Sequence, residues 1–216
     1  MKQRRLIVVT DQGTALAFSE LFDQVLENPD KIEKEDVLLF EGGTDVDPEY
    51  YGQKRGGRTQ FPNHDRDLRE KVFFLKAQKA GAACIGVCRG SQFLTVMCGG
   101  KLIQDVTGHC GTHSMMPYSE EHIIRVTSTH HQMCYPFDLP QKDYDILGWS
   151  YPSLSKHYHN GDNKEEVEPP VEPEIIWYPK QRSLAIQGHP EYLGKNDPFP
   201  VYCRNLVKKY IFEETL

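Results

Sequence analysis

Short apolar runs alternate with helically periodic stretches along the chain, and this alternation is typical of an α/β sheet. Apolar runs at residues 6–9, 37–40 and 83–87 predict buried strands. Apolar residues spaced three or four apart predict helices at residues 15–26, 67–79, 91–98 and about 200–212. In the second of these helices, Leu68, Val72 and Leu75 form the stripe that is expected to face the core.

The second half of the chain has shorter, more strand-like signals, at residues 123–126, 146–149, 175–178 and 184–187. The whole pattern predicts a single flavodoxin-like α/β domain over residues 1–216. Its mostly parallel central sheet is flanked by helices, and an additional short antiparallel strand region is expected. The acidic, proline-rich stretch at about residues 161–174 holds six acids and one lysine. It predicts a solvated loop, with a partner-docking segment as the alternative.

Composition narrows the classes of function. The 216 residues carry 25 Lys and Arg against 31 Asp and Glu, and the net charge of −6 disfavours a nucleic-acid groove or an anionic membrane surface. The sequence contains no run of 18 apolar residues, so no membrane span is predicted. Six cysteines without a signal peptide favour a reducing compartment. We therefore expect a cytoplasmic protein that binds neither nucleic acid nor membrane.

A cysteine follows the third predicted strand in the sequence Gly-Val-Cys-Arg-Gly, residues 86–90, where a helix is expected to begin. This strand, tight turn and helix are the context of a nucleophile elbow, with Cys88 in the place of the usual serine. The flanking glycines allow a strained turn, and the helix dipole favours a thiolate over a thiol. The alternative is a small buried hydrophobe, but the context favours a nucleophile.

A cysteine nucleophile needs a base, and the base needs a carboxylate to orient it. His189, Pro190 and Glu191 directly follow the predicted strand at 184–187. We expect His189 to exchange protons with Cys88 and the leaving group, and Glu191 to fix the imidazole tautomer. For the negative oxygen of a tetrahedral intermediate, we expect the backbone N–H of Gly43, or of Gly42, together with that of Arg89.

With these pieces in place, the sequence resembles the class I glutamine amidotransferases, and most closely the branch of γ-glutamyl-γ-aminobutyrate hydrolases, the C26 peptidase group. The matching segments occur in family order. They are GGTDVDP (42–48), YG (51–52), DRDLRE (65–70), GVCRGSQ (86–92), GGKLIQD (99–105), STHHQ (128–132) and QGHPE (187–191). Hydrolases of this branch have a longer stretch before the STHHQ segment than residues 106–127 provide here.

The resemblance implies a Cys–His–Glu triad and attack on a γ-glutamyl amide. It implies that Gln92 and the segment His130, His131 and Gln132, together with Gly42, contact the glutamyl group. The function expected is the glutaminase activity of an amidotransferase, which releases ammonia through a glutamyl thioester. Its partners would be glutamine or another γ-glutamyl compound and an ATP-dependent synthetase or ligase, since the sequence has no G-x-x-x-x-G-K-[ST] motif. No cofactor is expected.

Two alternatives to an amidotransferase subunit remain open, a stand-alone γ-glutamyl-amine hydrolase and a catalytically silent scaffold or binding protein. A homo-oligomer is also left open.

Two further clusters are interpreted as structural. His109 and His113, with Cys110 and His122, have ligand types that suit zinc. Because Gly111 and Pro117 disfavour a helix there, the segment predicts a pocket-rim or interface loop, and no metal site. The segment at 65–70, with Asp65, Arg66, Asp67 and Glu70, is expected to cap a helix and to pair locally.

Overall fold

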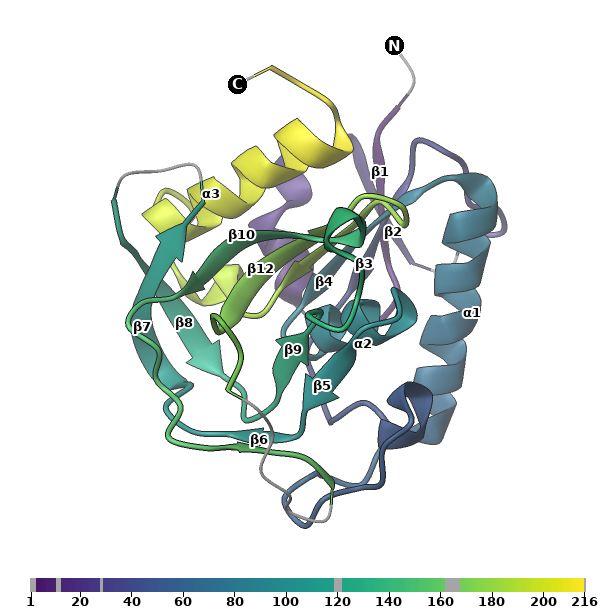
Figure 1. Cartoon of the computed structure of the whole chain (residues 1–216). Coiled ribbons are helices and arrows are strands. Elements are labelled where there is room, and N and C mark those ends of the chain that lie inside the picture. The colour runs from purple at the N-terminus through teal and green to yellow at the C-terminus, as the bar shows by residue number, and fades with distance from the viewer. Residues whose placement is uncertain (1–2, 11–12, 28, 119–121, 162–167, 216) are drawn as a thin grey trace.

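A mixed sheet of nine strands forms the centre of the molecule (Figure 1). The computed structural model describes residues 3–10, 13–27, 29–118, 122–161 and 168–215. Within these residues the strand order is β2-β1-β3-β4-β13-β12-β10-β7-β8. The first five, which pair in parallel, are β2 (Gln24–Glu27), β1 (Arg5–Val8), β3 (Val37–Phe40), β4 (Ala83–Val87) and β13 (Ser183–Ile186). The antiparallel half contains β12 (Pro173–Tyr178), β10 (Asp145–Ser150), β7 (Cys110–Pro117) and β8 (Ile124–Thr129).

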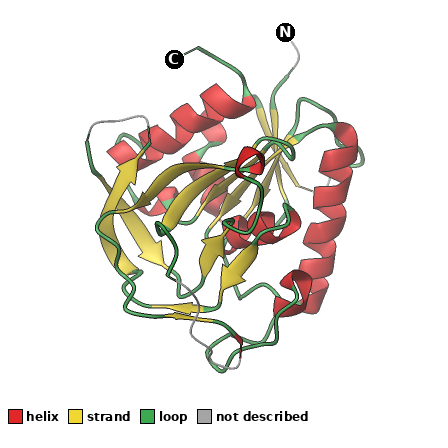
Figure 2. Ribbon diagram, viewed as in Figure 1, coloured by secondary structure: helices red, strands yellow, loops and turns green. Residues whose placement is uncertain are grey.

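Helices cover both faces of this sheet (Figure 2). Successive strand residues point to opposite faces, so Leu6 joins one hydrophobic cluster while Ile7 joins the other. The helix α3 (Pro198–Leu206), continued by a π-turn at Val207–Ile211, packs on the first cluster. The helices α1 (His64–Ala80) and α2 (Arg89–Met97) contribute to the second. The predicted α/β class with a central sheet and flanking helices is confirmed.

Smaller elements connect the strands of the central sheet. Two short antiparallel pairs are β5 (Lys101–Ile103) with β9 (Met133–Tyr135) and β6 (Asp105–Val106) with β11 (Tyr158–His159). The 3₁₀ turns are η1 (Gly13–Ala17), η2 (Ser19–Leu21), η3 (Pro48–Tyr51), η4 (Gln141–Asp143) and η6 (Pro190–Tyr192). Among the described helices, none has both the length and the apolar content needed to cross a bilayer.

The helix predicted at residues 15–26 is wrong. Two 3₁₀ turns occupy its first part, and β2 forms the sheet edge in its last part. The chain turns at Asp23, whose side chain accepts a hydrogen bond from the Arg4 N–H at 2.7 Å. Pairing of β2 beside β1 supplies the backbone hydrogen bonds that a helix would otherwise have provided.

The helix predicted at 67–79 is confirmed, but the side expected to face the core is wrong. Leu68, Val72 and Leu75 are 58%, 42% and 55% exposed. The buried residues of α1 are instead Asp67, Glu70, Phe74 and Ala77. The two acidic side chains face inward because they pair with a buried arginine at the beginning of α2, as described below.

Two segments that were expected to be loops lead into strands. Residues 162–167 of the acidic stretch lie outside the described residues, but its end is not solvated. Glu172 and Glu174 are buried, and β12 begins at Pro173. Likewise, the segment around His109 and His113 leads into and forms part of β7.

Candidate active site

Cys88 lies at a strained turn between β4 and α2. Its backbone has φ 52° and ψ −113°, a conformation that residues with a Cβ rarely adopt. The turn is tight on both sides. A Cβ on Gly86 would lie 2.3 Å from the Gly90 carbonyl oxygen, and one on Gly90 would lie 2.0 Å from that of Phe40. Glycine is therefore required at both positions for the elbow to pack against β3.

His189 lies just beyond the end of β13, and its orientation is fixed from three sides. Its Nδ1 lies 2.7 Å from Glu191 Oε1. The Thr127 hydroxyl accepts from the His189 N–H at 3.0 Å and donates to its carbonyl at 2.7 Å. The Tyr192 ring stacks on the imidazole, with centroids 4.4 Å apart and planes inclined by 6°.

The imidazole and the cysteine meet over Gly42, at the end of β3. A Cβ on Gly42 would lie 3.3 Å from His189 Cε1 and 3.7 Å from Cys88 Cβ. Burial lowers the pKa of His189, but interactions with the Cys88 sulfur and the Glu191 carboxylate outweigh it and raise that pKa to about 9. The imidazole is therefore protonated at neutral pH and can donate a proton.

The backbone at Gly43 is held by Arg66. The Arg66 Nη2 donates to the carbonyl oxygens of Glu41 and Gly42, both at 2.9 Å. In a planar trans peptide the N–H points opposite to the C=O, so the Gly43 N–H is directed away from Arg66. Gly43 has φ 147°, and a Cβ there would lie 2.0 Å from Arg66 Nη1. Only glycine fits at this position.

The second expected donor, Arg89, begins α2, where the first backbone N–H groups of a helix lack intrahelical acceptors. Its buried guanidinium pairs with the carboxylates of Asp67 and Glu70, and its Nε donates to the Thr44 carbonyl at 3.1 Å. Burial and the nearby Arg66 charge lower the pKa of Arg89 to about 10, against the raising effect of Asp67. The side chain thus ties the elbow to α1 and to the loop after β3.

The expected substrate-contact residues divide into two groups. Gln92, in α2, donates to the Gln132 carbonyl oxygen at 3.3 Å, so the turn that carries Gln132 lies against α2. The Gln132 side-chain amide is buried, and neither its nitrogen nor its oxygen has a hydrogen-bond partner among the residues that the structure describes. His131 Nε2 lies 3.1 Å from Asp45 Oδ2, and this hydrogen bond raises the pKa of His131. His130 points elsewhere, with its ring 4.6 Å from that of His109.

Sequence reasoning missed the role of α1 in supporting the elbow. The expected local pairing is present between Arg66 and Glu70, at 2.8 Å, but the helix is capped by Asn63. Asp67 and Glu70 reach across to Arg89 rather than only along their own helix. A signal was present in the two acids spaced i, i+3 on the side of the helix opposite to the apolar stripe.

Comparisons with known proteins agree with this architecture. The fold and the related sequences define a class I glutamine amidotransferase-like protein. The Peptidase C26 family model matches residues 8–135. The chain belongs to the Peptidase C26 family.

The glutamine amidotransferase-like protein YvdE of Lactococcus lactis is 32% identical over 172 residues, which cover 76% of this chain and 69% of that protein. A Mycobacterium tuberculosis protein with a glutamine amidotransferase name is 40% identical over 78 residues, but this match covers only 25% of its length. The glutaminase domain of CTPS from Trypanosoma brucei, solved with acivicin bound, has a similar fold. Its TM-score is 0.58 at 15% identity, over 100% of this chain and 96% of that one.

Proposed function

We propose that this protein hydrolyses a γ-glutamyl amide through a triad of Cys88, His189 and Glu191. The observation that carries the proposal is the convergence of three features at the carboxyl ends of the parallel strands. A cysteine lies in a strained elbow, a histidine approaches it over a glycine, and a carboxylate lies 2.7 Å from the far nitrogen of that histidine. This is the arrangement that nucleophilic acyl transfer requires.

In the first half of the reaction, the Cys88 thiolate attacks the γ-carbonyl carbon and a C–S bond forms. The carbonyl oxygen becomes negative and accepts hydrogen bonds from the backbone N–H groups of Gly43 and Arg89. The His189 imidazolium donates its proton to the leaving nitrogen as the C–N bond breaks. Ammonia or an amine departs, and a glutamyl thioester remains.

In the second half, neutral His189 removes a proton from water, and the resulting hydroxide attacks the thioester carbon. The C–S bond breaks, the thiolate of Cys88 is restored, and glutamate is released. Glu191 holds the imidazole throughout and stabilises its protonated form.

Recognition of the glutamyl group is assigned to polar groups near the elbow. Substrate with a free α-amino and α-carboxylate needs fixed donors and acceptors. Gln132 has a buried side-chain amide that makes no hydrogen bond within the described part of the chain, and Gln92 lies against its backbone. Gly42 and His131 would form the rest of the wall of the glutamyl pocket.

For the leaving group we favour ammonia from glutamine, delivered to an ATP-dependent synthetase or ligase. The names of YvdE and of the CTPS glutaminase domain support this choice. The match to Peptidase C26 favours a second candidate, a stand-alone hydrolase of γ-glutamyl amines. The two share one mechanism and differ in the group bound to the γ-carbonyl.

The test uses the purified chain alone with glutamine and with γ-glutamyl amines, measuring ammonia, amine and glutamate release. Cys88→Ala is expected to reduce turnover by more than about a thousandfold. Cys110→Ala, at an exposed cysteine, is the matched control and should retain turnover. Rapid turnover of γ-glutamyl amines without a partner would select the stand-alone hydrolase.

Unchanged turnover in Cys88→Ala would remove the nucleophile assignment. A wild-type chain that turns over none of these substrates, with a Cys88 that iodoacetamide labels no faster than Cys110, would favour a silent binding protein.

A further inference from the structure

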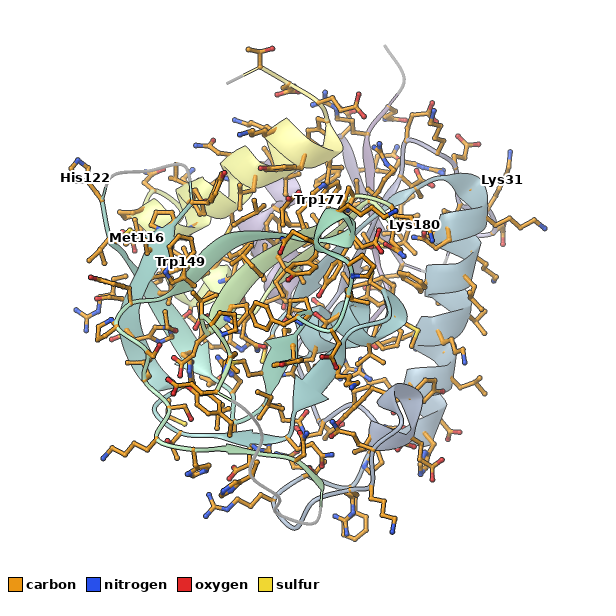
Figure 3. The ribbon with its side chains drawn as sticks, viewed as in Figure 1. Lys31, Met116, His122, Trp149, Trp177 and Lys180 are labelled. Atoms are coloured by element: carbon orange, nitrogen blue, oxygen red, sulfur yellow. The ribbon has the colours of Figure 1, made fainter. Side chains whose placement is uncertain are left out.

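His109, which directly precedes β7, and His113, within β7, face the same buried region. Residues four apart on a strand share a face, so the i, i+4 spacing of His109 and His113 has a geometric meaning here without a helix. Both are nearly inaccessible, with side chains 1% and 6% exposed. Cys110, on the opposite face, is exposed. His122 lies at the outer end of the β7–β8 hairpin and points outward (Figure 3).

A buried carboxylate from β12 completes the cluster. Glu174 Oε1 lies 2.8 Å from His113 Nε2 and 3.4 Å from His109 Nδ1. One ligand atom from each of the three side chains can be chosen so that all lie within 4.8 Å of one another. Tetrahedral zinc with bonds of about 2.1 Å separates its ligand atoms by about 3.4 Å. The donors are thus already near the spacing that such an ion needs.

The distal nitrogen of His109 faces a second carboxylate. His109 Nε2 lies 3.3 Å from Glu172 Oε2. Glu172 is itself held by the backbone N–H groups of Leu154 and Ser155, each at 2.7 Å, and by the Tyr158 hydroxyl at 2.9 Å. A carboxylate behind a ligating histidine is the usual second layer of a protein metal site, because it fixes the ring and increases its basicity.

Several polar atoms of the cluster have no hydrogen-bond partner among the described residues. They include Glu174 Oε2 and His113 Nδ1. His130, whose ring lies beside that of His109, has a further buried nitrogen without a partner. Its Nδ1 must donate to the Gln132 carbonyl at 2.8 Å, which leaves Nε2 unprotonated in the neutral ring, and that buried atom has no partner. Buried polar groups without partners are costly, and a bound cation would satisfy them.

We propose that His109, His113 and Glu174 bind a zinc-type divalent cation, next to the imidazole of His130. Imidazole nitrogens favour zinc, cobalt or nickel over calcium or magnesium, which prefer oxygen ligands. The carboxylates of Glu172 and Glu174 balance the two positive charges. This site differs from the sequence-based expectation of a loop without metal, and it does not depend on the chemistry of Cys88.

The cation would join three segments that meet beside the candidate active site. It would connect β7 to β12 and, because the His130 N–H donates to the His109 carbonyl at 3.2 Å, would also hold the turn that carries Gln132 toward the proposed substrate. Its role is to hold that turn against the antiparallel half of the sheet.

A second group of side chains in the structure could also bind a divalent cation. Asp105, His157 and His159 also have donor atoms within 4.8 Å of one another. However, Arg58 Nη1 lies 3.1 Å from Asp105 Oδ2, so a positive charge already occupies that carboxylate. Both histidines there are also only half-buried. We therefore assign the cation to the His109 cluster.

The test titrates the full chain, first treated with EDTA, with ZnCl₂ by calorimetry and with CoCl₂ by visible spectroscopy. We expect one zinc per chain, a higher thermal midpoint with zinc, and the intense visible bands of four-coordinate cobalt. His113→Gln and Glu174→Gln should each weaken zinc binding by at least about a hundredfold, and Glu172→Gln by about ten- to a hundredfold. Cys110→Ser and His159→Gln are the matched controls and should bind as the wild type does.

Absence of zinc binding at micromolar concentration would overturn the proposal and leave a buried ion network. Binding that persists in both His113→Gln and Glu174→Gln, or that is lost in His159→Gln, would also overturn it. If those ligand variants fail to fold, the wild-type cobalt spectrum decides. A thiolate-to-cobalt band would place the ion on a cysteine and exclude this site.

Discussion

The strained backbone of Cys88 predicts an unusual order of stability among its variants. A residue with a Cβ at φ 52° and ψ −113° costs about 1–3 kcal/mol, which glycine does not incur. Glycine in turn loses about 0.5–1 kcal/mol relative to alanine through the flexibility of the unfolded chain. With a strain near the middle of that range, Cys88→Gly should be about 1 kcal/mol more stable than Cys88→Ala.

Comparing the two variants cancels the loss of the thiol, because neither has one. The measurement is urea unfolding followed by circular dichroism, with the thermal midpoint as a second readout. For a chain of this size, the expected 1 kcal/mol corresponds to about 2–4 °C. The matched control is the pair Leu75→Gly and Leu75→Ala in an exposed turn of α1, where glycine should instead be the less stable by about 1 kcal/mol.

If glycine is the less stable residue at both positions, the elbow stores no strain, and the argument that the fold forces Cys88 into this conformation fails. If glycine is the more stable residue at position 88 alone, the surrounding fold imposes the elbow geometry, because neither variant has a thiol whose contacts could hold the turn.

Three further perturbations test the site from other directions. Gly42→Ala places a methyl group 3.3 Å from His189 Cε1 and should lower kcat/KM by at least about tenfold with little change in thermal midpoint. The control is Gly13→Ala, where the added methyl group meets no described atom within 4 Å, so kcat/KM and the thermal midpoint should both stay unchanged. Because the pKa of His189 is raised to about 9 from the usual 6.5, the imidazolium and its stabilisation of the fold are complete below about pH 6.5 and are lost as pH rises through about 9. Glu191→Gln removes one cause of that raised pKa and should move the alkaline limb of the kcat/KM profile to lower pH; an unmoved limb would refute the pairing. Arg89→Met removes the guanidinium that pairs with the buried carboxylates of Asp67 and Glu70, of which Glu70 keeps its pairing with Arg66, and should lower the free energy of unfolding by about 3–5 kcal/mol in urea titration. A loss below about 1 kcal/mol would show that this ion pair does not hold the elbow.

The elbow and the strands around it could be predicted because their signals are local. Gly86 and Gly90 flank the cysteine within five residues, and each is required by a contact inside the same turn or with the adjacent strand. The histidine and its carboxylate are two residues apart, and their 2.7 Å contact forms within one 3₁₀ turn. Sequence patterns describe such short-range geometry well.

The parts that failed depend on contacts between distant segments. The apolar stripe of α1 ends up exposed because Glu70 and Asp67 find their partner in α2, and no periodicity within α1 encodes that pairing. Glu174 lies in a segment whose composition suggested a solvated loop. It is buried instead, because it pairs with His113, which lies 61 positions earlier in the chain. Buried polar groups are placed by their partners, so their environment follows from topology rather than from local composition.

The division of the sheet into a parallel and an antiparallel half also separates the tasks of the site. The proposed triad comes from the ends of β4 and β13, in the parallel half, where open α/β sheets place their catalytic groups. The turn carrying Gln132 follows β8, at the far edge of the antiparallel half, and its backbone meets the parallel half at Gln92. Changes in β7 and β12 can therefore reshape the substrate side without altering the elbow, whereas β8 also carries Thr127, whose hydroxyl holds the backbone of His189.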